Sequence, residues 1–194
     1  MRYLSVAEGL AVPLVCLGII TPLMAASCGD TPGPMPASPS PDAGSTIRDN
    51  GSLFRLISQT DPFSGYRAFP NADEFTAGRL DGSEAHRPIV RTSLNALALG
   101  ALQNGRLPAG GAFPDGSVIF KEIQPRAGAP ATTYAVMYKD ARNATAGSGW
   151  LWAEFGPDGS VQYSASNNGG ACISCHQRQE GRSHDLVRTF ERQR

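Results

Sequence analysis

Two cysteines and a histidine near the end of the sequence have the residue types and the spacing to bind a cofactor. Cys172 and Cys175 are separated by two residues, and His176 follows directly. This is the spacing of a c-type haem attachment site. Each thiol can add to one haem vinyl group, and the neighbouring imidazole can then bind the iron. The sequence therefore predicts one haem, held covalently through Cys172 and Cys175, with His176 as an axial ligand.

Other interpretations of these residues are a short-loop disulfide, a thioredoxin-like redox pair and half of a zinc site. A thioredoxin-like pair is expected just after a strand in a βαβ setting, whereas this motif lies near the end of the chain. A zinc site needs two further ligands at suitable spacing, and His86 and His184 are the only other histidines. We expect both of these to be ordinary surface or loop histidines, so haem attachment is the favoured interpretation.

The first 27 residues have the pattern of an export signal. Met1-Arg2 gives a positive start, an apolar run extends from Leu10 to Ala26, and small residues precede Cys28. The Ala-Ala-Ser-Cys ending also resembles a bacterial lipoprotein cleavage box, in which Cys28 becomes the lipidated first residue. Simple cleavage that leaves Cys28 as a thiol is the alternative. Both interpretations predict an exported, periplasmic protein, and the first adds a lipid anchor to a membrane.

Residues 28–50 are rich in Pro, Ser, Gly, Ala and Asp. Such a segment cannot bury enough apolar surface to fold, so we expect a disordered spacer. Residues 51–194 are then sufficient for one haem domain. The formal net charge is +0, without the basic stripe that nucleic-acid binding requires.

Within this domain, apolar spacing and turn residues predict mainly short helices in the first half and strands in the second half. A short helix or a packed entry segment is expected at 52–58, a short strand at 89–92 and a short helix at 93–104. β-branched and aromatic residues then predict strands at 117–123, 132–139, 149–155 and 160–163. The turn Gly156-Pro157-Asp158-Gly159 makes the last two strands a hairpin, so the pairing should be antiparallel. The haem motif should lie at the start of a helix. Residues 185–193 should form a closing helix. The expected class is α+β, with an antiparallel sheet of about four to five strands and a few short helices.

Several short motifs follow one another in an order that can be compared with known families: Val90-Arg91-Thr92, Asn95 with its short helix, Phe113 to Glu122, Met137 to Asp140, Gly149-Trp150 with Trp152, Cys172 to His176, and Asp185-Leu186-Val187. In this order they resemble the cytochrome P-460 family, which includes the cytochromes c′-beta. The run Phe-Pro-Asp-Gly-Ser ending in Lys-Glu, combined with the haem motif, is the specific part.

The resemblance implies an antiparallel-sheet fold, often a homodimer, with one high-spin haem. His176 would be the single axial ligand, and the opposite side of the iron would be open. In the enzymes of this family a strand lysine forms an additional covalent bond to the haem edge, and the matching residue is Lys121. Arg91 matches a family arginine near the haem, where its fork could bind a propionate or orient a ligand. The alternative is that Lys121 and Arg91 are both solvated residues of outer strand faces. If Lys121 points at the haem, alternation sends Glu122 to the other face.

The resemblance implies two functions of different kinds. The enzymes oxidise hydroxylamine and pass electrons to a soluble cytochrome, whereas the cytochromes c′-beta bind nitric oxide or similar small gases. A third interpretation is an electron-transfer cytochrome with Met137 as sixth ligand, although a strand methionine more often packs in a core. We favour hydroxylamine, or a similar small nitrogen compound, as the substrate.

The resemblance also implies that the hydroxylamine-oxidising enzymes need a distal carboxylate, within hydrogen-bond reach of the substrate proton that it takes. The strand from Tyr134 to Tyr138 carries no acid. Glu180 lies four residues after His176, which places it on the side of the axial ligand. Glu154 is the more open candidate for the base.

Overall fold

The computed structural model describes residues 47–69, 75–77 and 85–192. The predicted export signal, Cys28 and most of the predicted spacer lie outside these residues. Within them, no helix is both long enough and apolar enough to cross a membrane.

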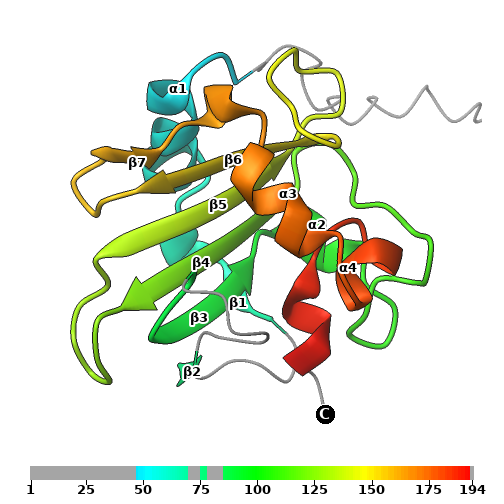
Figure 1. Cartoon of the computed structure of the whole chain (residues 1–194), viewed down its shortest axis with the longest axis horizontal. Coiled ribbons are helices and arrows are strands. Elements are labelled where there is room, and N and C mark those ends of the chain that lie inside the picture. Colours follow the sequence, from blue (N-terminus) through cyan, green and yellow to red (C-terminus); the bar gives the residue numbers. More distant parts are fainter. Residues whose placement is uncertain (1–46, 70–74, 78–84, 193–194) are drawn as a thin grey trace, which may run out of the picture. The chain divides into compact units, whose positions relative to one another are not determined.

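An antiparallel sheet forms the centre of this part of the chain (Figure 1). Two short strands both pair with β3, and the order then runs β3-β4-β5-β6-β7. The described strands are β1 (Arg67–Ala68), β2 (Thr76–Ala77), β3 (Ile89–Leu94), β4 (Val118–Gln124), β5 (Thr133–Lys139), β6 (Trp150–Phe155) and β7 (Val161–Tyr163). The predicted α+β class and antiparallel pairing are confirmed. The predicted strands correspond to β3 to β7, and the two-residue strands β1 and β2 are additional.

The helices of the described residues are short. They are α1 (Asn50–Arg55), the π-helical turn η1 (Leu56–Thr60), the 3-10 turn η2 (Phe63–Gly65), α2 (Ala96–Gly100), the 3-10 turn η3 (Ala165–Asn167), α3 (Gly170–His176), α4 (Glu180–Ser183) and the 3-10 helix η4 (Arg188–Arg192). The haem motif therefore lies on a helix, as expected. The predicted closing helix is instead a loop followed by η4.

The folded unit begins earlier than the predicted boundary at residue 51. Asp49 and Ser52 form a capping box at the start of α1, in which the Asp49 carboxylate accepts from the Ser52 backbone N–H at 2.6 Å. Ile47 is 4% exposed and packs with Leu53 in the core. Residues 47–50, which we assigned to the spacer, are thus held by a cap and by an apolar contact.

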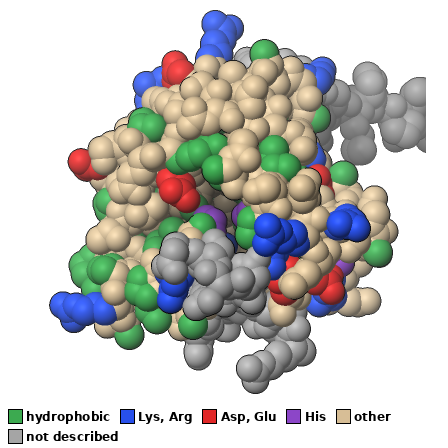
Figure 2. All heavy atoms as spheres, in the orientation of Figure 1, with side chains coloured by type: hydrophobic (Ala, Val, Ile, Leu, Met, Phe, Trp, Pro, Cys, Tyr) green, Lys and Arg blue, Asp and Glu red, His purple; other side chains and the backbone are tan. Residues whose placement is uncertain are grey.

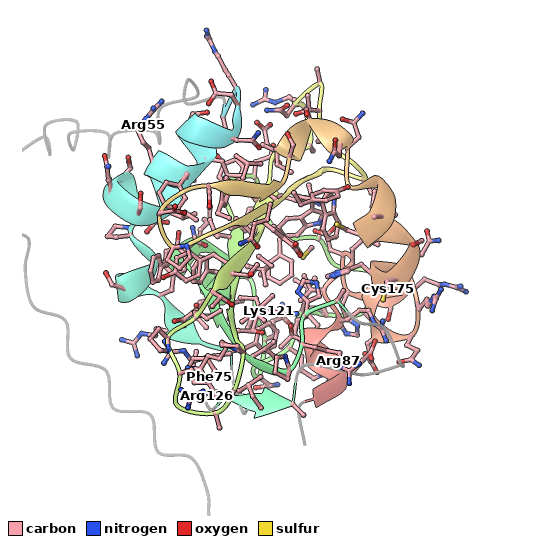
Figure 3. All side chains as sticks on the ribbon, turned by 60° about the vertical axis from the view of Figure 1, so that its left-hand side comes forward. Arg55, Phe75, Arg87, Lys121, Arg126 and Cys175 are labelled. Atoms are coloured by element: carbon pink, nitrogen blue, oxygen red, sulfur yellow. The ribbon has the colours of Figure 1, made fainter. Side chains whose placement is uncertain are left out.

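Both faces of the sheet are covered, and α1 and α3 lie on opposite sides of it (Figure 3). Alternation along β4 sends Phe120 into a core with Leu53 and Ile57 of α1 and η1. The adjacent Ile119 points the other way, into a core with Trp152 and with Val187 from the end of the chain. Because α1 closes one face with apolar side chains, the cysteines and the histidine of α3 lie over the opposite face of the sheet.

Asn95 joins three elements at one edge of the sheet. Its side-chain oxygen accepts from the backbone N–H groups of Ala98 and Val118, both at 3.0 Å, and its amide donates to the carbonyl of Gly116. These bonds cap α2 and fix the start of β4 against it. Helix α2 is shorter than the predicted 93–104 segment because β3 continues to Leu94 and Asn95 already serves as the cap.

Candidate functional site

A cavity of about 300 Å³ lies between the sheet and the C-terminal elements. Figure 2 shows a hollow on this face in which histidine side chains are visible. Strands β3 to β7 form one wall, and α3, η4 and the residues just before β3 form the others. Its lining is mostly apolar and includes Val90, Ile119, Ala135, Met137, Trp152 and Val187. Cys172, Cys175 and His176 also line it, so the fold directs all three motif residues into one apolar space.

Helix α3 lies close to the sheet because of the residue that precedes it. Gly169 has a backbone φ of 67°, and a Cβ atom at this position would collide with the Trp152 indole. The left-handed backbone and the lack of a side chain both favour glycine here. The Trp152 ring in turn packs edge-on against the His176 imidazole, with ring centroids 4.8 Å apart. No disulfide joins Cys172 and Cys175, which leaves both thiols available for addition to vinyl groups.

The His176 ring is held in one orientation and one tautomer by a backbone carbonyl. Its Nδ1–H donates to the Leu186 carbonyl at 2.8 Å, and because a carbonyl only accepts, the proton must be on Nδ1. The lone pair is therefore on Nε2, as in a metal-binding histidine oriented by a backbone carbonyl. Burial, and next the charge of Lys121, lower the pKa of His176 to about 4. The ring is thus neutral at physiological pH, which is the form that binds a metal.

A buried ion pair fixes the loop that presents the Leu186 carbonyl. The Lys139 ammonium lies 2.8 Å from both carboxylate oxygens of Asp185, and both side chains are about one-tenth exposed. Asp185 also accepts from the Phe113 backbone N–H at 2.8 Å, and its carbonyl accepts from the Trp150 indole at 3.0 Å. Asp185 thus connects the sheet to the residue that orients His176.

Replacing Asp185 with alanine should destabilise the holoprotein by about 3–5 kcal/mol, because it leaves the Lys139 charge buried without its partner. Urea unfolding measures this change. Glu180→Gln is the matched control: its carboxylate is about 40% exposed and lies 3.1 Å from both Arg106 and His184, and glutamine keeps an oxygen acceptor for both, so the loss should be only about 0–1 kcal/mol. Equal losses in the two variants would contradict the anchoring role of Asp185.

Lys121 and Glu154 line the cavity from neighbouring parts of the sheet. In the register, Lys121 of β4 lies opposite Ala135 of β5, and Ala135 lies opposite Glu154 of β6, so all three share one face. Burial raises the pKa of Glu154, and the charge of Lys121 opposes that shift. Figure 3 shows Lys121 in the sheet and Cys175 on α3. The predicted alternation holds, because Glu122 points to the opposite face.

The structure places Arg91 away from the cavity. In the register Arg91 lies opposite Glu122, on the other face from Lys121, and its Nε donates to the Glu122 carboxylate at 2.7 Å. Its guanidinium also lies over the Phe75 ring, 4.6 Å from the centroid. This position corresponds to the alternative interpretation of a strand-face arginine, and we no longer assign Arg91 a role at the haem.

The other two histidines lie in loops or turns, as expected, but neither is an exposed surface residue. His86 lines the cavity, and its ring centroid lies 6.0 Å from that of His176. His184 is 7% exposed, packs against Phe190 and makes a hydrogen bond with the Glu180 carbonyl, so it is a structural residue outside the cavity. Spacing in the sequence gave no signal for either position, since both depend on how loops close over the sheet.

Met137 packs in the core, as expected for a strand methionine, and Glu180 lies outside the cavity lining. Met137 is 7% exposed in the core and its side chain borders the cavity. Glu180 pairs with Arg106 and is not among the cavity-lining residues, so it does not compete with Glu154 as a base.

Sequence reasoning missed Arg188, which borders the cavity from η4. Its Nη1 lies 2.9 Å from the Cys175 sulfur, and its guanidinium also binds the Glu191 carboxylate through two hydrogen bonds. Arg188 therefore connects the C-terminal segment to the attachment helix. Only its position immediately after the Asp-Leu-Val motif could have suggested a role.

These donors and this cavity fit a c-type haem. Two thiols on one helix, an imidazole with its lone pair on Nε2 and an apolar space beside them are what covalent attachment and axial ligation require. Among the described residues, no group of three or more His, Cys, Asp or Glu side chains is arranged to hold a metal ion directly. Fold and site together define a haem-binding, cytochrome-like protein.

Comparison with protein families agrees with this class. The sequence model of the family described as Cytochrome P460 matches residues 83–189, more than half of the chain. The chain therefore belongs to the cytochrome P460 family, as its motif order predicted. A search of curated proteins found no matching relative.

Proposed function

We propose that this protein oxidises hydroxylamine, or a similar small nitrogen compound, at a haem attached through Cys172 and Cys175 and ligated by His176. When bound, the haem supplies the metal that takes up the substrate nitrogen and the centre that accepts its electrons. With nitric oxide as product, each hydroxylamine loses three electrons and three protons. The electrons pass to a soluble acceptor cytochrome, and the protons require an acceptor within the cavity.

The observation that carries this proposal is the Glu154 carboxylate in the wall of the cavity. The neighbouring strand β5 contributes the apolar side chains of Ala135 and Met137 to the cavity wall beside Glu154, and Lys121 of β4 lies on the same face beyond Ala135. Burial raises its pKa, which makes the ionised carboxylate a stronger proton acceptor than an exposed one. A base with a pKa nearer the working pH is suited to taking a proton from the substrate.

Lys121 is the second functional residue of the proposal. Its place in the cavity wall supports the bond to the haem edge that the family resemblance implies. Forming this bond removes two hydrogen atoms and therefore needs a two-electron oxidant, such as a peroxide. We also propose export to the periplasm, with a lipid on Cys28 as the anchor.

Hydroxylamine-dependent reduction of an acceptor cytochrome by the purified holoprotein tests the proposed reaction. We expect turnover that depends on covalent haem, together with a ferrous absorption band far to the red of ordinary c-type haem if Lys121 is bonded. The intact mass checks the same bond, because it is two hydrogen atoms lower than for the two thioethers alone.

The cytochrome c′-beta type of function is the second candidate, supported by the apolar character of the rest of the cavity. An apolar wall favours neutral diatomic gases over polar substrates. Binding of nitric oxide or carbon monoxide without any hydroxylamine turnover would replace the first proposal with this one.

A further inference from the structure

The imidazoles of His86 and His176 lie close together in the cavity wall. Their ring centroids are 6.0 Å apart and their planes are inclined at 68°. They come from distant parts of the chain, because His86 precedes β3 whereas His176 ends α3. The backbone of His86 has a φ of 57°, the left-handed conformation in which histidine is found several times more often than most residues.

The distance between the two rings corresponds to ligation of a single metal from opposite sides. An imidazole nitrogen lies ~2.0–2.1 Å from a metal that it binds, and the ring centroid lies ~1 Å further back. Two imidazoles on opposite sides of one metal therefore have centroids separated by about 6 Å. His176 follows the two attachment cysteines directly, so the iron must lie next to its ring. The second ring is then at the distance of a second ligand.

The other side chains near the His176 ring are poorer candidates for a second metal ligand. Trp152 contacts the ring at 4.8 Å, but an indole N–H only donates, and this one already donates to the Gly147 carbonyl at 3.0 Å. Met137 borders the cavity from β5, where it packs in the core opposite Trp152. Imidazole is also the commonest metal ligand among side chains.

We infer that His86 is the second axial ligand of the haem iron in the resting protein, and that a small ligand must displace it. This inference rests on the haem attachment in the proposed function but not on the identity of the substrate. The family resemblance implies an open coordination position opposite His176. In this protein His86 would occupy that position and leave it reversibly. The apparent affinity for a small ligand is then reduced by the fraction of molecules in which His86 has left the iron.

Absorption spectra and carbon monoxide binding of the holoprotein test this inference. We expect wild-type haem to be low-spin and the His86→Ala haem to be high-spin, and free imidazole should return the variant to low-spin. Carbon monoxide affinity should rise at least about tenfold in His86→Ala. Its binding rate, which saturates in wild type because His86 must leave first, should become proportional to carbon monoxide concentration. His184→Gln is the matched histidine control and should behave as wild type, because His184 lies outside the cavity.

The wild-type spectrum decides the question even if His86→Ala does not fold. A high-spin wild-type spectrum in protein with covalent haem would overturn the inference and leave the proposed function intact. A low-spin spectrum that persists in His86→Ala would also overturn it and would assign the ligand to another side chain, such as Met137. Failure of the proposed function has a different signature: no hydroxylamine turnover in a protein whose spin state still responds to His86→Ala. A mass without covalent haem would overturn both.

Discussion

Changing Cys172 and Cys175 together to alanine, in a chain that also carries Lys121→Ala, should yield protein whose haem is removed completely by denaturation. Each thiol forms one thioether, so each single variant should retain covalent haem through the other sulfur. The Lys121 change removes the proposed bond to the haem edge, so this triple variant, which keeps His176 and the apolar cavity, can hold haem only through reversible interactions. Haem staining after denaturing electrophoresis, together with the intact mass, measures the difference.

Ser174→Ala is the matched control for this experiment. Ser174 lies between the two cysteines on α3, is exposed, and makes only a 3.4 Å hydrogen bond to the Ala171 carbonyl. It should therefore attach haem as wild type does. If the triple variant still carried haem after denaturation, the assignment of Cys172, Cys175 and Lys121 as the covalent attachment points would be wrong.

Changing Glu154 to glutamine should lower hydroxylamine turnover by roughly 10²–10⁴-fold, the usual contribution of a positioned general base. Glutamine keeps the size of the side chain but cannot accept the proton. The variant should therefore retain its covalent haem and its affinity for carbon monoxide. Steady-state kinetics with an acceptor cytochrome measures the loss, and Glu122→Gln on the opposite face of the sheet serves as the control.

The pH dependence of turnover provides a second measurement on the same variant. The base acts only when ionised, and burial raises the pKa of Glu154. Wild-type turnover should therefore be low in acid and should rise as the pH passes upward through this raised pKa. The rise should be absent from the residual activity of Glu154→Gln. An unchanged rate and an unchanged profile would exclude Glu154 as the base.

The positions of the strands and of the attachment helix could be predicted because they depend on short stretches of chain. The turn from Gly156 to Gly159 connects two runs with strand composition, and the structure has β6 and β7 there. Alternation along β6 places Trp152 and Glu154 on the same face, and both line the cavity. Helix α2 was predicted too long, because apolar spacing did not show that Asn95 caps it.

Arg91 and Lys121 lie on opposite faces of the sheet, and strand composition alone does not determine this. Both residues lie in strands that were correctly predicted, yet they share a face only for certain registers of β3 against β4. A shift of one residue in that register would move every side chain of β3 to the other face. The observed pairing of Arg91 with Glu122 therefore decided that Arg91 lies outside the cavity.

The sequence by itself determined the attachment chemistry, because the two thiols and the imidazole are fixed relative to one another by a few covalent bonds and one turn of helix. It also determined the antiparallel class, through the spacing of strands and turns. Only the tertiary structure decided which other groups surround that helix. Glu154 and His86 enter the cavity from segments far apart in the chain, and their approach depends on strand register, loop closure and packing against Trp152, which no local pattern encodes.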